Sequence, residues 1–240
     1  AKNRSKNFAP KIYKESSMYD FVKERLRVLT ANEFDGLNAY YDEKNQSKQT
    51  SAAFLYGRAL YQFHKNNFKQ SLKTIQEIDT DDETKVLVKI LKAQNLNRID
   101  AKQGKEFIEL LLTQYPENNL VLEETAQILM QSDDLKNLDQ AIRNIRKLSY
   151  QEPDNPHYQD MLAIAYYNAM KPIASAQAMA KRAHLLGQNY QAVRILKNLR
   201  NNKELDYYQA AKIDAQVVEY EPLITEDEHK REQSPNRPSR

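Results

Sequence analysis

Residues 51–78 read SAAFLYGRALYQFHKNNFKQSLKTIQEI, and this stretch decides the fold. Apolar and small side chains recur three or four positions apart in its first half and again in its second half, which puts them on one face of an α-helix. These positions are Ala53, Tyr56, Gly57 and Leu60, followed by Phe68, Leu72, Ile75 and Ile78. The polar residues 65–67 separate the two halves. The stretch therefore predicts a helical hairpin, with helices over 51–65 and 68–78 that turn their apolar faces toward each other.

The same pattern continues toward the C-terminus. It predicts four more hairpins, over 84–97 with 104–114, 120–131 with 138–150, 156–169 with 173–186, and 190–200 with 205–220. Upstream, Ser17 followed by Asp20 is similar to a capping box, so a first helix is expected to begin there. A weaker helical pattern covers residues 33–42. The chain is therefore expected to be all-α.

The turns between the hairpins are also related. Asp82, Asn118 and Asn155 follow one another at intervals of 36 and 37 residues, and the last two belong to the proline-containing turns 116–119 and 153–155. Proline ends one helix, and Asn or Asp caps the next by accepting hydrogen bonds from free backbone amides. Small residues stand where neighbouring helices approach closely, at Gly57, Ala126, Ala141 and Ala176. A period close to 34 residues is typical of tetratricopeptide repeats, and the predicted fold is an all-α, tetratricopeptide-like solenoid of about five to six helical hairpins.

The repeat pattern divides the chain into three parts. Residues 17–222 carry the helical repeats. Residues 1–16 contain Pro10, several lysines and no helical period, so we expect an extended linker. Residues 223–240 are expected to be a disordered tail, because the segment from Glu226 onward lacks apolar side chains. The chain begins without a methionine, and we expect it to be a piece of a longer protein whose upstream part precedes the linker.

Composition argues against several function classes. The formal net charge of the 240 residues is only +3, which is too small to favour nucleic-acid binding. Residues 1–14 carry +5 and residues 229–240 carry +3, which leaves −5 for the rest of the chain. No apolar run reaches the roughly 18 residues that a membrane-spanning helix needs. The lack of cysteine rules out disulfides and thiolate metal sites, and it fits the cytosol and the periplasm equally well.

The sequence contains no recognisable pattern for catalysis. No two of its four histidines, His64, His157, His184 and His229, stand four residues apart on a helix, so the zinc-binding motif HExxH is absent. Its four scattered glycines cannot form a phosphate-binding loop. Paired acidic residues fall at turns and helix starts, where negative charge favours the helix dipole. We therefore predict no catalytic residue, no metal ligand and no cofactor in this chain.

Protein binding is the function that remains, because stacked hairpins form a groove lined by their inner helices. Aromatic rings supply contact area in such a groove, and arginine supplies directional hydrogen bonds. The positions expected to face the groove are Phe54, Arg58, Tyr61, Lys92, Gln127, Tyr166 and Tyr167. Tyr166 and Tyr167 could instead pack into the neighbouring hairpin.

Several segments resemble one known family in their order and spacing. Residues 16–21, SSMYDF, are similar to a linker and following helix in that family, and residues 56–60, YGRAL, with Phe68 are similar to its first repeat. Residues 185–187, LLG, resemble its last full repeat, and residues 208–215, YQAAKIDA, resemble its terminal helix. The family is that of the β-barrel assembly-enhancing proteases, periplasmic zinc metallopeptidases of Gram-negative bacteria with a C-terminal tetratricopeptide domain. The charged insertion 42–49 and the basic tail depart from the family pattern.

The resemblance implies a periplasmic location and an upstream peptidase domain that acts in cis and holds the zinc on its HExxH helix. None of those zinc-binding residues falls in this chain. The resemblance implies that the repeat domain is a docking domain. It would bind the outer-membrane protein assembly machinery or unfolded and misfolded outer-membrane proteins. This chain is then expected to be the non-catalytic part of a zinc metalloendopeptidase that serves outer-membrane protein assembly and quality control.

Two other interpretations stay open. A stand-alone cytosolic repeat scaffold or co-chaperone has the same architecture. A clamp for a chaperone tail, however, needs Lys and Asn at matching groove positions, which Phe54 and Arg58 do not supply. The basic ends of the chain could also contact anionic lipid headgroups or lipopolysaccharide.

Overall fold

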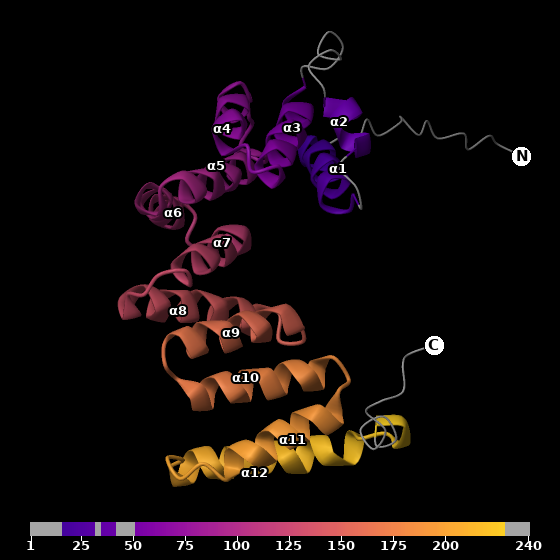
Figure 1. The fold of residues 1–240 in the computed structure, drawn as a ribbon, viewed down its shortest axis with the longest axis vertical. Coiled ribbons are helices and arrows are strands. Elements are labelled where there is room, and N and C mark those ends of the chain that lie inside the picture. Colours follow the sequence, from indigo (N-terminus) through magenta and orange to yellow (C-terminus); the bar gives the residue numbers. More distant parts are fainter. Residues whose placement is uncertain (1–15, 32–34, 42–50, 229–240) are drawn as a thin grey trace, which may run out of the picture. The chain divides into compact units, whose positions relative to one another are not determined.

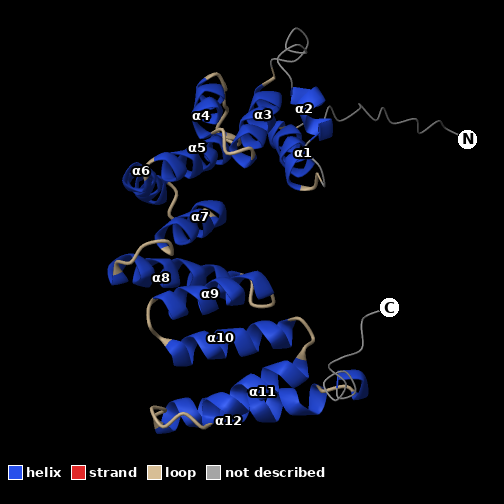
Figure 2. Ribbon diagram, in the orientation of Figure 1, coloured by secondary structure: helices blue, strands red, loops and turns tan. Residues whose placement is uncertain are grey.

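The structure, a computed structural model, describes residues 16–31, 35–41 and 51–228 (Figure 1). All regular secondary structure in these ranges is helical, which confirms the predicted all-α class (Figure 2). The predicted linker up to residue 15, the insertion 42–49 and the tail from residue 229 lie outside the described residues. No described helix is both long and apolar enough to cross a lipid bilayer.

The described ranges contain twelve α-helices and the short 3-10 helix η2. The first six are α1 (Ser17–Leu29), α2 (Asp35–Tyr41), α3 (Ala52–His64), α4 (Phe68–Gln76), α5 (Lys85–Ile99) and α6 (Ala101–Gln114). The others are α7 (Asn119–Leu129), α8 (Leu135–Gln151), α9 (Pro156–Asn168), α10 (Pro172–Leu185), α11 (Asn189–Arg200), α12 (Tyr207–Tyr220) and η2 (Glu221–Leu223). Each of α1 to α12 overlaps a predicted helix, whereas residues 226–228, which are also helical, fall in the predicted tail. The largest differences are at the starts of α6 and α8, which begin three residues earlier than predicted.

Two compact units divide the chain after Gly104, inside α6. Unit 1 comprises residues 1–104, and unit 2 comprises residues 105–240. In unit 1, α3 packs against α1 and α4, and α4 packs against α5. In unit 2, each helix from α7 to α12 packs against the next one along the chain. Packing between neighbouring helices is typical of hairpin repeats.

The start of α1 differs from the prediction by one residue. Ser16, not Ser17, is the N-cap, because its backbone is extended and its hydroxyl accepts a hydrogen bond from the amide two residues later, at 3.2 Å. The Ser17 hydroxyl instead donates to Asp81 in the turn before α5. Asp81 also accepts bonds from the amide and the hydroxyl of Thr84, at 3.0 and 2.8 Å. The carboxylate that organises this turn is therefore Asp81, one residue before the predicted Asp82.

Two other predicted caps are confirmed. The Asn118 side chain accepts hydrogen bonds from two amides in the first turn of α7. The Asn155 side chain accepts one from an amide in the first turn of α9, and Pro156 follows it at the first helical position. Proline is favoured there because its missing N–H would have no helical partner. These turns fix where α7 and α9 begin.

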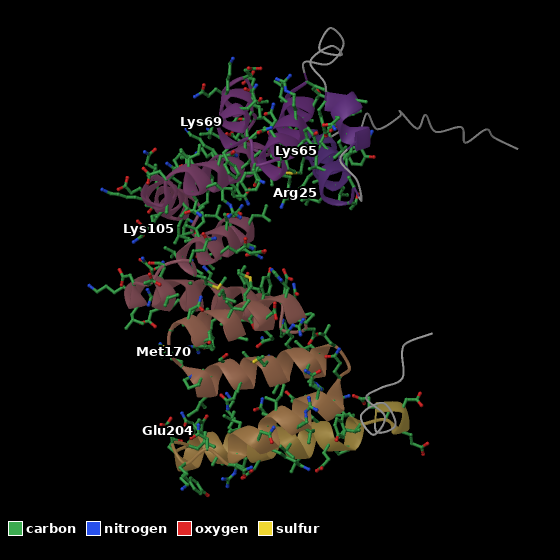
Figure 3. The ribbon with its side chains drawn as sticks, in the orientation of Figure 1. Arg25, Lys65, Lys69, Lys105, Met170 and Glu204 are labelled. Carbon is green, nitrogen blue, oxygen red and sulfur yellow. The ribbon has the colours of Figure 1, made fainter. Side chains whose placement is uncertain are left out.

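The hairpins α3–α4 and α9–α10 share three local features. Both first helices are 13 residues long. Each turn contains one non-glycine residue with positive φ, Asn66 at 61° and Met170 at 56°. Figure 3 labels Met170 at the turn between α9 and α10. In each second helix a buried serine, Ser71 or Ser175, donates to the carbonyl twelve residues earlier at 2.8 Å. The same geometry thus recurs 104 residues along the chain, about three tetratricopeptide periods.

Unit 2 contains two apolar clusters. One joins residues of α7, α8, α9 and α10, and the other joins residues of α10, α11 and α12. Ala126 and Ala141 are fully buried in the first cluster, at the packed pair α7 and α8. Ala176, the third small residue predicted in this unit, is half-buried against the second cluster. Small side chains therefore allow close packing at two of these three positions.

The segment after α12 packs back onto α11. The Glu228 carboxylate accepts hydrogen bonds from the amides of Tyr190 and Thr225, at 3.1 and 3.0 Å. The Asn189 side chain donates to the carbonyl of Leu223 at 3.2 Å. Residues 223–228, which the sequence predicts as the start of a disordered tail, are therefore bonded to the N-terminus of α11.

Candidate functional site: a partner-binding groove

Four of the seven predicted groove residues belong to unit 1, and three of these four are buried. Phe54 and Tyr61 expose only 5% and 8% of their surface. Tyr41 of α2 covers both, with its ring centroid 5.5 Å from each of theirs. The Tyr61 hydroxyl donates a hydrogen bond to Asn38, also on α2. α2 therefore occupies the face of α3 that the sequence pattern predicts to be open.

Arg58 is the third buried residue. Its Nη2 donates to Glu77 Oε2 at 3.3 Å, while its Nε has no hydrogen-bond partner among the described residues. Lys92, on α5, is half-buried. In this arrangement a partner reaches Phe54 and Tyr61 only if α2 moves away.

A buried carboxylate ties α2 to α1. Glu24 is 7% exposed, and its oxygens accept hydrogen bonds from the Tyr40 and Tyr41 hydroxyls at 3.0 and 2.6 Å. Arg27 pairs with the same carboxylate, and its guanidinium lies 4.2 Å from the centre of the Tyr40 ring. Burial, followed by the hydrogen bond and the negative charge of Glu24, raises the pKa of Tyr41. Tyr41 therefore stays protonated, and the cluster holds α2 in place.

The remaining three predicted residues lie in unit 2, Gln127 on α7 and Tyr166 and Tyr167 on α9. Tyr166 packs against the apolar cluster formed by α7 to α10. Tyr167, by contrast, leaves 73% of its surface exposed. One tyrosine of the pair thus packs into neighbouring helices, and the other faces outward.

Tyr167 lines an apolar pocket between α9, α10 and α11. The pocket has a volume of about 240 Å³. Its large apolar walls are Ile164, Tyr167, Met179 and Ile195. Asp160 and Arg182 also line it and bond to each other, with Oδ1 and Nε 2.9 Å apart. The pocket therefore combines an apolar interior with one neutralised ion pair.

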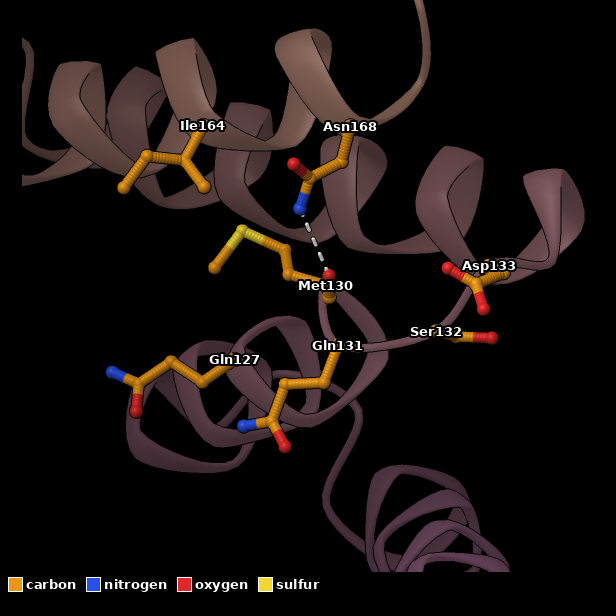
Figure 4. A pocket seen from close by; sticks show the side chains of 7 residues that line it. All are labelled: Gln127, Met130, Gln131, Ser132, Asp133, Ile164 and Asn168. Carbon is orange, nitrogen blue, oxygen red and sulfur yellow. Dashed lines mark hydrogen bonds between the residues drawn. The ribbon is translucent and has the colours of Figure 1, made fainter.

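A second hollow, of about 690 Å³, lies between α7, the α7–α8 turn and α9 (Figure 4). Three of its lining side chains are amides, Gln127, Gln131 and Asn168. The Asn168 amide donates to the carbonyl of Met130 at 3.0 Å, which ties α9 to the end of α7. Among the residues that the structure describes, Asp133 is the one charged residue that lines this hollow. The hollow is thus more polar than the pocket beside it.

Ile164 lines both hollows and joins them into one surface. We call this surface the α7–α9–α11 groove. Its apolar members are Met130, Ile164, Tyr167, Met179 and Ile195, and its amides are Gln127, Gln131 and Asn168. Large apolar side chains next to hydrogen-bonding groups are typical of protein interfaces. Two predicted residues, Gln127 and Tyr167, belong to the groove, whereas Tyr166 does not line it.

The chemistry of the groove suits binding. Its charged residues are Asp133 and the mutually bonded Asp160 and Arg182. Two serines, Ser132 and Ser175, also line it, and the Ser175 hydroxyl donates to the Ala163 carbonyl at 2.8 Å. In the part of the chain that the structure describes, no group of three or more His, Cys, Asp or Glu residues could hold a metal ion.

No protein-family model matches this chain, and no curated protein matches its sequence.

Most apolar residues of the groove are not among the positions predicted from the sequence. The members absent from the predicted set are Met130, Ile164, Met179 and Ile195. A signal for one of them exists on α9, where Asp160, Ile164 and Tyr167 recur at i, i+4 and i+7. This spacing puts them on a face opposite the buried Leu162 and Ala165. Ile164 and Tyr167 are therefore large apolar side chains on the exposed side of α9.

Proposed function

We propose that this chain is a protein-docking domain, a tetratricopeptide-like array of helical hairpins that holds a segment of a partner protein in the α7–α9–α11 groove. The observation that carries this proposal is the pair Tyr167 and Ile164, which are 73% and 47% exposed on a helix whose opposite face is packed. Exposed apolar residues grouped in a hollow are typical of interaction sites. The geometry that recurs in the hairpins α3–α4 and α9–α10 supports the repeat architecture.

In this function the groove acts as a preformed receptor. A side chain of the partner enters the apolar pocket between α9 and α11, and its burial drives association. The amides of Gln127, Gln131 and Asn168 bond the polar backbone of the partner, so that the backbone is not left unpaired. Tyr167 supplies a large contact area at a small cost in conformational entropy, because its ring has only two rotatable side-chain bonds.

We further propose that the chain is the docking part of a periplasmic zinc metalloendopeptidase that acts in the assembly and quality control of outer-membrane proteins. The support is the resemblance of residues 16–21, 56–60, 185–187 and 208–215 to that family. The partners are then the outer-membrane assembly machinery or unfolded and misfolded outer-membrane proteins, with a peptidase domain in cis. Zinc belongs to that peptidase domain, because this chain carries no HExxH motif.

Replacing Tyr167 by alanine tests the docking function. Truncating a central aromatic anchor of an interface costs about 2 kcal/mol or more. Tyr167→Ala should therefore weaken the binding of a labelled, urea-unfolded outer-membrane barrel protein by about 25-fold or more, measured by fluorescence anisotropy after dilution. Tyr150→Ala is the matched control, because Tyr150 lies on α8, is 88% exposed and does not line the groove. Equal affinities for the two variants would contradict the proposal.

The cellular assignment has a separate test, an immunoblot of fractionated source cells with an antibody against this chain. We expect a periplasmic band well above 28.1 kDa, the mass of the 240 residues. A cytosolic band close to that mass would instead support the stand-alone scaffold or co-chaperone. This result bears on the parent protein and its compartment, and the binding measurement bears on the groove.

A further inference from the structure

We infer that the segment held in the groove is basic as well as apolar: it places one large aliphatic or aromatic side chain between α9 and α11 and a lysine or arginine beside the α7–α8 turn. This inference rests on the proposed docking function and adds the chemistry of the partner. Two features carry it, the size of the apolar pocket and the distribution of charge along the groove.

The apolar pocket is sized for a single side chain. Its volume of about 240 Å³ lies below the range of about 300 to 1,000 Å³ that is usual for small-molecule sites. Tyr167 and Met179 on its walls are 73% and 51% exposed, so an inserted side chain buries apolar surface on both sides of the contact. Met179 also adapts its shape to the inserted group, because methionine has several flexible bonds. One large apolar residue of a polypeptide fits this pocket.

The charge of the groove is negative and lies at one end. At the α9–α11 end, Asp160 and Arg182 neutralise each other across 2.9 Å. At the α7–α8 turn, Asp133 is exposed and forms no ion pair within the described ranges. Glu123, one helical turn before Gln127 on α7, accepts a hydrogen bond from the Gln127 amide and contacts the His157 ring, each at 3.3 Å. A cation on the partner therefore meets an unbalanced carboxylate at the α7–α8 end.

The amides between the two ends fit a polypeptide chain. Gln127, Gln131 and Asn168 line the hollow that leads from Ile164 to Asp133 (Figure 4). The Asn168 nitrogen bonds to Met130 at 3.0 Å, which leaves the amide oxygen as an acceptor for a backbone N–H. An acidic segment fits poorly, because its carboxylate would lie beside the carboxylate of Asp133. Arg182 would not compensate for this repulsion, because it is already paired with Asp160. The groove thus discriminates by charge as well as by apolar fit.

Selection from a phage-displayed library of short random peptides tests the inference on the full chain. We expect the wild-type chain to select peptides that combine a large apolar residue with lysine or arginine. Changing that basic residue to glutamate in a selected peptide should weaken binding about fivefold, because an exposed attractive pair becomes a repulsive one. The same change should cost nothing in the Asp133→Lys chain. High salt should reduce the difference, because it screens exposed charges.

Asp154→Lys is the control for the added charge, because Asp154 is an exposed acid in the turn between α8 and α9 and does not line the groove. It should keep the wild-type preference for basic peptides. Selected peptides without a basic residue, or a preference unchanged in Asp133→Lys, would overturn the inference. If those peptides still lose affinity for Tyr167→Ala, the docking function stands. If no peptide depends on Tyr167, the docking function fails as well.

Discussion

At the residue scale, Gly57 makes room for the buried carboxylate that holds α2. A Cβ at this position would lie 2.6 Å from the Tyr41 hydroxyl and 2.7 Å from a Glu24 oxygen. It would also lie 2.9 Å from the Glu24 Cβ, which cannot move without shifting α1. The sequence predicts Gly57 as a small residue that allows close helix approach. In the structure its missing side chain leaves space for the hydrogen bond between Glu24 and Tyr41, and the Tyr41 ring covers Phe54 and Tyr61.

Gly57→Ala should therefore destabilise unit 1. Overpacking a buried site costs about 1–3 kcal/mol, and the better helix propensity of alanine returns up to about 1 kcal/mol. We expect a net loss of about 1 kcal/mol in the free energy of unfolding, measured by urea denaturation with circular dichroism. Gly36→Ala is the control, because a Cβ there would meet no atom of the described residues within 4 Å. If both variants were as stable as the wild type, the proposed crowding would be wrong.

At the scale of elements, Asp81 connects the start of α1 to the start of α5. Its carboxylate accepts hydrogen bonds from Ser17 on α1 and from the amide and hydroxyl of Thr84 before α5. These bonds, led by the one from Ser17, lower the pKa of Asp81 to about 2. An unfolded aspartate has a pKa of about 3.9, so folding favours the ionised form.

The pH dependence of this contact follows from that difference. A carboxylate whose pKa falls on folding stabilises the folded state fully above its unfolded pKa, and this contribution is lost as the pH falls toward about 2. Asp81→Asn should therefore remove part of the acid sensitivity between about pH 4 and pH 2. Hydrogen exchange of the α1 and α5 amides over this range measures it. Asp154→Asn, in an exposed turn, should keep the wild-type profile, and identical profiles for all three chains would contradict this account.

At the scale of the whole chain, the sequence predicts the helices well and the open surfaces poorly. Helical periodicity predicts each of α1 to α12, because a buried face leaves a repeat of three to four residues in the sequence. The turn residues Asn118 and Asn155 predict their caps, because capping is a local interaction. Both signals depend on residues that are close together in the chain.

Exposure depends on contacts between elements, which local patterns do not contain. Phe54 and Tyr61 occupy positions suited to a groove, yet the weakly patterned helix α2 covers them. Gln127 and Tyr167, by contrast, line hollows of unit 2 in the described part of the chain. The boundary between the two units could not be predicted from helical periodicity either, because it falls inside the continuous helix α6.

The most direct test of the docking claim is site-specific photo-crosslinking. A photoreactive phenylalanine analogue replaces Tyr167 in one chain and Tyr150 in another, and each is irradiated with the same labelled, unfolded outer-membrane barrel protein. A crosslink from position 167 with none from position 150 is the result that the groove predicts, since both side chains are exposed and only Tyr167 lines it. Crosslinks of equal yield from both positions, or from position 150 alone, would show that the partner does not bind in the α7–α9–α11 groove.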